Sequence, residues 1–543
     1  AWPHAGLNLA FTQQPTSAAS GVSISPAVKV QVNDSNNIRV ASSTASVTIA
    51  ITPGTPATGG PGALGGTLTQ TAVNGVATFS GLSINRDGTG YTLTATSSGV
   101  SNGTSSTFNI TSGTASALAI TSVNGGSNPT AGTAFSVVVQ AQDSNGNAAN
   151  VVANTSVTLS LNSGTGTLGG TLSGTITSGT NSVTISGVTY TKAQSGVILT
   201  ATRTSGDSLA AGNSAPFTVN PGSATKLVFT TQPGGGTGGS AWTAQPVVTV
   251  EDANSNTVTS SNAPITLTIG TNPSGGALTC AINPQSATSG VDTFAGCNIN
   301  KTGTGYTLTA ASSGLTSATS STFNITLGPA AQLAFTTQPS ASTVATNAFA
   351  TQPTVTVQDA GGNTVTTSTA SITLAITSGT GAAGAGLTCT ANPKNAASGV
   401  DTFAGCKIDT GSNSSYTLTA TSGTLTSAVS NSFTIQDFSM AVTTAIFPNP
   451  MNHKSASATA TITLTSIGSF TGSVTVSCSA SSGPNCAMSP TSVTVPANGT
   501  NTSKMSLSTS GNSTGAGTYT ITITGTFGTL SRSVSPSPTW TLD

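Results

Sequence analysis

Hydrophobic and polar residues alternate along many short stretches of this chain. The alternation is clear in SVTIAI (46–51), SVTLSL (156–161), PITLTI (264–269) and SITLAI (371–376). A period of two predicts β-strands that turn one face toward a core and the other toward water. Glycine, asparagine, aspartate and proline separate these stretches, and such residues typically mark turns. The pattern therefore predicts an all-β fold.

A seven-residue phrase recurs and supplies the period of the chain. It reads LAFTQQP from Leu9, LVFTTQP from Leu227 and LAFTTQP from Leu333, and a divergent copy, LAITSVN, begins at Leu118. Successive leucines lie 109, 109 and 106 residues apart. A period of this length corresponds to one small domain, so the repeats predict a tandem array.

Each repeat contains about seven short alternating strands, which is the strand number of an immunoglobulin-like sandwich. We therefore predict a linear array of five immunoglobulin-like β-sandwich domains. The last domain lacks the recurring phrase, as terminal repeats often do. The predicted boundaries are an N-terminal segment at 1–6, domains at 7–112, 113–221, 222–328 and 329–436, and a divergent C-terminal domain at 437–543.

A tyrosine begins the penultimate strand in three of the repeats. Tyr91, Tyr306 and Tyr416 occupy this position, where such sandwiches often place a corner tyrosine that hydrogen-bonds to a loop. Val197 stands at the same position in the second repeat, so we expect the bond to be missing there.

The combination of these phrases resembles a known family. The order V-x-V-x-D-x-x-x-N-x-V, a Val/Thr strand, G-V-x-T-F and G-Y-T-L-T-A resembles the immunoglobulin-like repeats of invasin- and intimin-type bacterial adhesins. It is still more similar to the LAFTTQP-type repeats of large secreted bacterial proteins. The resemblance covers residues 7–436 and implies an extracellular stalk, adhesin or fibre without catalytic residues.

Composition narrows the possible partners. Charged residues make up 4% of the chain, and 12 basic and 12 acidic side chains give a formal net charge of zero. A basic patch for nucleic acid or anionic lipid is therefore not available. The sequence also has no apolar run of about 18 residues, so we predict no membrane insertion. A neutral surface favours self-association, because charge repulsion is weak.

Six cysteines form three local pairs, and we predict the disulfides Cys280–Cys297, Cys389–Cys406 and Cys478–Cys486. In our alignment of the repeats, Cys280 and Cys389 match Gln70 and Gly174, and Cys297 and Cys406 match Leu82 and Val188. Both members of a pair are thus present or absent together, as a disulfide requires. Disulfides indicate an oxidising compartment. The chain starts at Ala1 without Met, and we expect a mature secreted or cell-surface product.

A polar turn follows the second strand of each repeat, with an aspartate at Asp34, Asp143, Asp252 or Asp359. A calcium site is one interpretation, but calcium takes six to eight oxygen ligands and each turn offers one or two carboxylates. The other interpretation is a turn in which Asp and Asn cap their own backbone. We predict no cofactor and no enzymatic activity, because the chain shows no plausible triad or carboxylate pair.

Three tryptophans lie outside the repeat pattern. Trp2, with Pro3 and His4, and Trp540 stand at the two ends, where each could fold back on its own domain or contact another copy. Trp242 lies in a glycine-rich insertion and is the candidate ligand-facing ring.

The sequence predicts a structural subunit of an extracellular bacterial filament or surface fibre. Its copies would assemble head to tail through the terminal segments, because head-to-tail contacts generate open filaments. The alternative is a monomeric adhesin or carbohydrate-binding stalk, with glycans or a host cell surface as partners.

Overall fold

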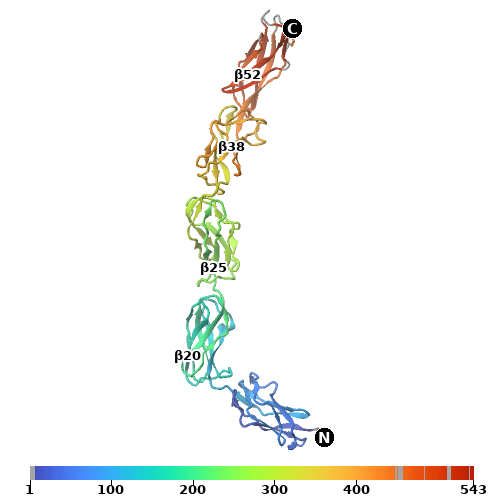
Figure 1. The fold of residues 1–543 in the computed structure, drawn as a ribbon, viewed down its shortest axis with the longest axis vertical. Helices are drawn as coiled ribbons and strands as arrows, with labels where there is room; N and C mark the ends of the chain where they lie inside the picture. The colour runs from blue at the N-terminus through green and yellow to red at the C-terminus, as the bar shows by residue number, and fades with distance from the viewer. Residues whose placement is uncertain (1–5, 447–448, 451–456, 482, 510–514, 537–538) are drawn as a thin grey trace.

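The computed structural model describes residues 6–446, 449–450, 457–481, 483–509, 515–536 and 539–543. Within these residues the chain is all-β, and the single helix is a short 3₁₀ turn, η1 (Asn124–Gly126). No helix in this part of the chain reaches the length and hydrophobicity needed to cross a membrane. Immunoglobulin-like β-sandwich units follow one another end to end, and the two chain ends lie at opposite ends of an elongated molecule (Figure 1).

The first unit contains three sheets. The largest has the order β7-β4-β11-β12-β1-β3-β8, the second is β2-β13-β10-β5, and β6 pairs with β9. Its strands are β1 (Asn8–Gln13), β2 (Ala18–Ala19), β3 (Val28–Asn33), β4 (Ser46–Ile51), β5 (Thr58–Gly59), β6 (Leu64–Gly65), β7 (Thr69–Thr71), β8 (Val76–Phe79), β9 (Ser83–Ile84), β10 (Gly88–Tyr91), β11 (Leu93–Ser97), β12 (Val100–Thr104) and β13 (Phe108–Thr111).

The second unit has longer strands and two main sheets. One sheet has the order β14-β15-β19-β17, and the other contains β18-β16-β20-β21 with β22 paired to β20. Its strands are β14 (Ala117–Val123), β15 (Phe135–Gln142), β16 (Thr155–Ser163), β17 (Leu168–Gly170), β18 (Ser173–Ile176), β19 (Ser182–Tyr190), β20 (Gln194–Ser205), β21 (Gly212–Asn213) and β22 (Phe217–Val219).

The third unit divides its strands among four small sheets, in the orders β23-β25-β29, β24-β34-β31, β28-β26-β32-β33 and β27-β30. Its strands are β23 (Lys226–Thr231), β24 (Gly236–Thr237), β25 (Val247–Glu251), β26 (Pro264–Ile269), β27 (Leu278–Thr279), β28 (Gln285–Ser286), β29 (Val291–Thr293), β30 (Asn298–Ile299), β31 (Gly303–Tyr306), β32 (Leu308–Ala311), β33 (Ala318–Thr319) and β34 (Phe323–Thr326).

The fourth unit repeats this plan with the sheets β35-β37-β41, β40-β38-β43-β44 and β39-β42, while β36 pairs with β45. Its strands are β35 (Gln332–Thr337), β36 (Ser342–Val344), β37 (Thr354–Gln358), β38 (Ser371–Ile376), β39 (Leu387–Thr388), β40 (Lys394–Asn395), β41 (Val400–Thr402), β42 (Lys407–Ile408), β43 (Leu418–Thr421) and β44 (Ala428–Val429).

The C-terminal unit continues directly from the fourth, because strand β45 (Thr434–Val442) pairs with strands of both units. This strand pairs with β36 as far as Gln436 and with β46 from Asp437 onward. The remaining strands are β46 (Ser457–Ile467), β47 (Gly472–Ala480), β48 (Asn485–Ser489), β49 (Ser492–Val495), β50 (Thr500–Ser508), β51 (Gly517–Tyr519), β52 (Ile521–Phe527), β53 (Leu530–Val534) and β54 (Trp540–Leu542). The strand thus changes partner between Gln436 and Asp437, and the count of five domains with their boundaries stays a prediction.

Alternation along the strands builds the cores, as β15 illustrates. Phe135, Val137, Val139 and Ala141 are buried, and the residues between them face outward. Each of the first three units encloses its own hydrophobic cluster, whereas the cluster of the fourth unit continues into the C-terminal unit. The first three joints are therefore stabilised by contacts other than a shared hydrophobic core.

Corner tyrosines anchor loops in the units. The Tyr91 hydroxyl donates to the carbonyls of Gly60 (2.9 Å) and Arg86 (3.0 Å), Tyr306 donates to Lys301 (3.0 Å), and Tyr416 donates to Thr410 (2.6 Å). In the second unit Val197 makes no such bond, but Tyr190 from β19 accepts the Gly166 N–H at 2.8 Å. A tyrosine from the preceding strand, which belongs to the other sheet, therefore bonds to a loop there.

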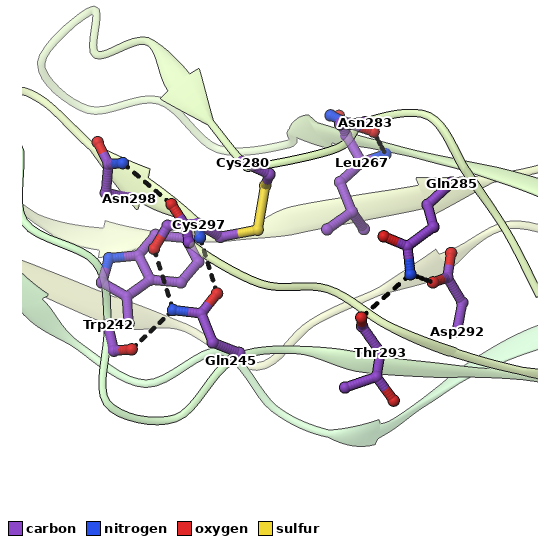
Figure 2. The surroundings of a disulfide bond; sticks show 11 residues. Trp242, Gln245, Leu267, Cys280, Asn283, Gln285, Asp292, Thr293, Cys297 and Asn298 are labelled. Carbon is purple, nitrogen blue, oxygen red and sulfur yellow. Dashed lines mark hydrogen bonds between the residues drawn. A yellow bond between two sulfur atoms is a disulfide. The ribbon is translucent and has the colours of Figure 1, made fainter.

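All three predicted disulfides are present, and all six cysteines are paired. Figure 2 shows Cys280–Cys297 beside the Trp242 indole, with Gln245 bonded to the backbone of both Trp242 and Cys297. The predicted match of Cys280 to Gln70 and of Cys389 to Gly174 is wrong by four residues. Strand pairing places Gly66 and Gly170 at the cysteine position, because Leu278, Leu64 and Leu168 occupy equivalent registers.

Steric crowding explains why both of these positions are glycine. Both have positive φ, +99° and +75°, and a Cβ would lie 2.6 Å from the Gly81 carbonyl oxygen or 2.0 Å from that of Gly187. The neighbouring segments therefore approach each other closely without a cross-link in the first two units.

We expect reduction of the disulfides to destabilise only the units that contain them. In the chain-entropy model, opening a loop of about 17 residues lowers the free energy of unfolding by roughly 3 kcal/mol. Differential scanning calorimetry of oxidised and reduced protein measures this, with the transitions of the first two units as internal controls. Equal shifts in every transition would contradict the assignment.

Candidate functional site at the joints between units

An aspartate closes the turn after the second strand in each of the first four units. In the second unit, Asp143 Oδ1 accepts the N–H groups of Asn145 and Asn147, both at 2.9 Å. Asp34, Asp252 and Asp359 accept the N–H groups two and four residues further on in the same way, at 2.8–2.9 Å. These are the self-capped turns that one of the two interpretations predicted.

The second carboxylate oxygen binds the linker from the preceding unit. Oδ2 of Asp143, Asp252 and Asp359 accepts the N–H of Gly113 (2.8 Å), Gly222 (2.7 Å) and Gly328 (3.1 Å), respectively. All three aspartates are at most 4% exposed. Each carboxylate therefore joins its own turn to the linker.

An asparagine four residues after the aspartate contacts the preceding unit. Asn256 Nδ2 donates to the Thr191 carbonyl, and the Ala193 N–H donates to Asn256 Oδ1, both at 2.9 Å. Asn147 contacts Asn85 and Asp87 (3.0 and 3.4 Å) and Asn363 contacts Asn300 and Thr302 (2.7 and 3.3 Å) with the same pair of bonds. We call each Asp–Asn pair with these bonds a clamp, and the bonds shared by all three joints go to backbone groups of the preceding unit.

Ser20 strengthens the first joint. Its hydroxyl donates to Asp143 Oδ2 at 2.6 Å and accepts from the side-chain amides of Asn145 and Asn147 at 3.1 and 3.0 Å. Burial by itself would raise the pKa of Asp143, but hydrogen bonds from Ser20, Asn147 and Gly113 outweigh it and lower the pKa to about 2. The pKa of Asp252 is also lowered, since hydrogen bonds from Asn256, Gly222 and Asn254 outweigh burial.

The fourth joint is built differently. Asp437 lies within the shared strand β45, and its carboxylate accepts the Gly411 N–H at 3.0 Å. Arg532 from β53 forms an ion pair with Asp437 and also donates to the Asp409 carbonyl at 2.7 Å. This joint therefore combines a continuous strand and a salt bridge with the hydrophobic cluster that both units share.

The clamps favour the self-capped turn over the calcium interpretation for Asp143, Asp252 and Asp359. N–H groups donate to both carboxylate oxygens of each aspartate. The turn at Asp34 likewise directs two N–H groups at Oδ1. Among the described residues no group of three or more His, Cys, Asp and Glu side chains could hold a metal.

The structure also corrects the expectation for Trp242. Its ring is 3% exposed and packs against Phe323 with the ring centroids 5.1 Å apart. A covered ring cannot offer a stacking face to a ligand. Phe349 packs on Phe433 in the same manner in the fourth unit, so Trp242 is a core residue.

Trp540 is fully buried in the C-terminal unit, where it lies opposite Tyr519 in the β51–β54 pair. The indole thus folds back on its own unit and is not exposed to a second copy. Trp2, Pro3 and His4 lie outside the described residues.

No family model matches this chain, and no curated protein sequence matches it. Among solved structures, the Escherichia coli adhesin FdeC has 14% identity and a TM-score of 0.21, over 60% of this chain and 97% of FdeC. The adhesin InvE of Yersinia pseudotuberculosis has 18% identity and a TM-score of 0.18, over 42% of this chain and 68% of InvE.

An alpha-2-macroglobulin of Escherichia coli has 13% identity and a TM-score of 0.20, and the similarity covers 99% of this chain and 53% of that protein. At such low identities and TM-scores, none of these similarities supports a conclusion about function.

Sequence reasoning did not identify the clamp asparagines or the linker glycines as interface residues. A signal was present, because each of Gly113, Gly222 and Gly328 stands five residues before the leucine that opens a repeat. The Asp-x-x-x-Asn spacing recurs in the same three repeats, and Ile38 replaces the asparagine in the first. The pattern shows a shared constraint, but it does not reveal that the contact lies between units.

We expect Asn256→Ala to loosen the second joint, because it removes both bonds to the preceding backbone. Loss of a buried hydrogen-bonding group costs about 1–3 kcal/mol. Hydrogen exchange at the Ala193 amide should accelerate by about tenfold or more. Asn36→Ala in the first unit is the control, since this exposed side chain belongs to a turn of the same type. Unchanged protection of Ala193 would contradict the clamp.

The lowered pKa of Asp143 predicts an acid-sensitive first joint. Its contribution is complete above the ordinary carboxyl pKa of 3.8 and is lost as the pH falls toward the folded value of about 2. The shift corresponds to roughly 2 kcal/mol. Thermal unfolding between pH 7 and pH 2 measures it against Asp143→Asn, which should be less stable at pH 7 and less sensitive to acid. Identical pH profiles would exclude this role.

Proposed function

We propose that this chain is a structural subunit of an extracellular bacterial filament or surface fibre. The clamp that recurs at three joints is the observation that supports the proposal. It holds successive sandwiches end to end through backbone contacts, and the neutral chain adds little charge repulsion between neighbours. The proposal assigns no catalytic residue.

The free end of the first unit supports head-to-tail assembly of copies. In the following three units, the Asp turn contacts the unit before it. The first unit carries the same turn at Asp34, with Ile38 in place of the clamp asparagine, and the Ile38 side chain is 64% exposed. Val73, in a neighbouring turn, is 72% exposed. We propose that the C-terminal end of another copy covers this end of the first unit. The N-terminal segment that contains Trp2, Pro3 and His4 would take part in the same contact.

The alternative function is a monomeric adhesin or stalk, secreted or displayed at the cell surface. An extended array of sandwiches serves equally as a spacer that carries a binding end away from a surface (Figure 1). In that case Ile38 would contact a glycan-bearing or host-cell partner and not another copy.

Electron microscopy and sedimentation of the purified chain distinguish these functions. The filament proposal predicts ordered polymers that Ile38→Asp abolishes, because a buried unpaired charge opposes the contact. Ile282→Asp is the matched control, since Ile282 is 60% exposed in the third unit. Dispersed single rods at high protein concentration would contradict the filament and favour the stalk. Polymers that persist in Ile38→Asp would exclude this end as the contact.

A further inference from the structure

One position in each repeated unit, at the end that faces the following unit, has its backbone in the left-handed region of φ and ψ. It is occupied by Gly21, Gly132 and Gly239 in the first three units, with φ of +71°, +74° and +73°. The N–H of each glycine donates to the carbonyl of Ile84 (2.8 Å), Tyr190 (2.8 Å) or Ile299 (3.0 Å). The position is thus the same in all three units.

The fourth unit has a threonine at this position. Thr346 has φ +67°, and its N–H donates to the Ile408 carbonyl at 2.8 Å. A β-branched residue is strained in this conformation, so positive φ alone does not explain why the other three units have glycine.

Close approach of the next unit explains the glycines. A Cβ at Gly239 would lie 2.4 Å from the Gly361 nitrogen and 2.5 Å from the Ala360 carbonyl carbon, in the Asp359 turn of the fourth unit. A Cβ at Gly21 or Gly132 would lie 2.7 or 2.3 Å from the side-chain nitrogen of Asn145 or Asn254. At Gly21 and Gly132 the obstructing atom is the movable end of an asparagine side chain, whereas at Gly239 the obstructing atoms are backbone. Gly239 is therefore the position at which a side chain obstructs the incoming Asp turn most strongly.

The unit that follows Thr346 approaches differently. It has no Asp-x-x-x-Asn turn after β46, where the Gly468 N–H instead donates to Asn413 Oδ1 at 2.8 Å. Thr346 and its neighbour Asn347 face Thr529 of the C-terminal unit, with the Thr346 and Thr529 hydroxyls 3.3 Å apart. A side chain at position 346 is therefore compatible with this partner.

We propose that this single position determines which kind of unit can follow. Glycine admits a unit with the Asp-x-x-x-Asn turn, and threonine excludes it. At all three joints the asparagine of the incoming turn bonds to backbone of the preceding unit. The turn that enters beside Gly239 also carries Gly361, where a Cβ would lie 2.1 Å from the Asn300 carbonyl oxygen. The surface at Thr346 fits only the C-terminal kind, so no further unit of the repeated kind directly follows the fourth unit.

The inference is tested in the full-length chain with Gly239→Thr. Gly314→Thr is the matched control, because Gly314 lies in the same unit, has φ +76° and has open space for at least 4 Å around the place where a Cβ would lie. Both variants carry the same backbone strain, but only Gly239→Thr obstructs the joint. Hydrogen exchange at the Gly328 amide, which bonds to Asp359, reports on the joint, and small-angle X-ray scattering reports on bending.

We expect Gly328 exchange to accelerate at least tenfold in Gly239→Thr relative to Gly314→Thr, with increased bending between the third and fourth units. Equal Gly328 protection in the two variants would overturn the inference. If Gly239→Thr unfolds the third unit, Gly239→Ala against Gly314→Ala repeats the comparison with a smaller side chain.

Thr346→Gly provides the reciprocal test. The fourth joint should remain closed, because its partner does not need the space that glycine leaves. Opening of this joint would contradict the inference, since threonine would then be required for the contact and not merely tolerated. These tests concern joints within one chain, so they succeed or fail independently of filament assembly.

Discussion

A buried aspartate that bonds simultaneously to its own turn and to the preceding linker is the interaction on which the extended architecture depends. In the second, third and fourth units, one carboxylate oxygen closes the turn and the other accepts a linker glycine N–H. Charged acceptors make stronger hydrogen bonds than neutral ones. Because the cores of the first three units are separate clusters, these polar contacts, and not a continuous hydrophobic core, connect them.

The chain thus contains two kinds of joint with different physical properties. The first three joints connect units through short linkers and hydrogen bonds to backbone, and Ser20 adds side-chain hydrogen bonds at the first of them. The fourth joins through the shared strand β45, the Arg532–Asp437 ion pair and a common hydrophobic cluster. Such a joint resists bending more strongly, because movement there would break strand pairing and expose apolar surface.

Several sequence predictions held because they depended on local patterns. Alternation predicted the strands, and the paired appearance of cysteines predicted the three disulfides. The alignment at Gln70 and Gly174 failed because segments between strands differ in length, and only strand pairing showed Gly66 and Gly170 at the cysteine position. The prediction that the Trp242 ring faces a ligand failed for a related reason. Its glycine-rich surroundings indicate an exposed loop, but the segment folds back so that the ring covers Phe323.

The sequence by itself determined the all-β fold, the period of the array and the disulfide partners. Each of these follows from contacts within one repeat, which recur and so leave a periodic signal. Only the tertiary structure decided what the Asp turns touch, why Gly21, Gly132 and Gly239 differ from Thr346, and how β45 links two units. These features depend on the approach of one folded unit to the next, where the asparagine contacts join residues 62, 65 and 63 positions apart in the chain. A recurring residue pattern shows a shared constraint, but it does not reveal which partner lies in the neighbouring unit.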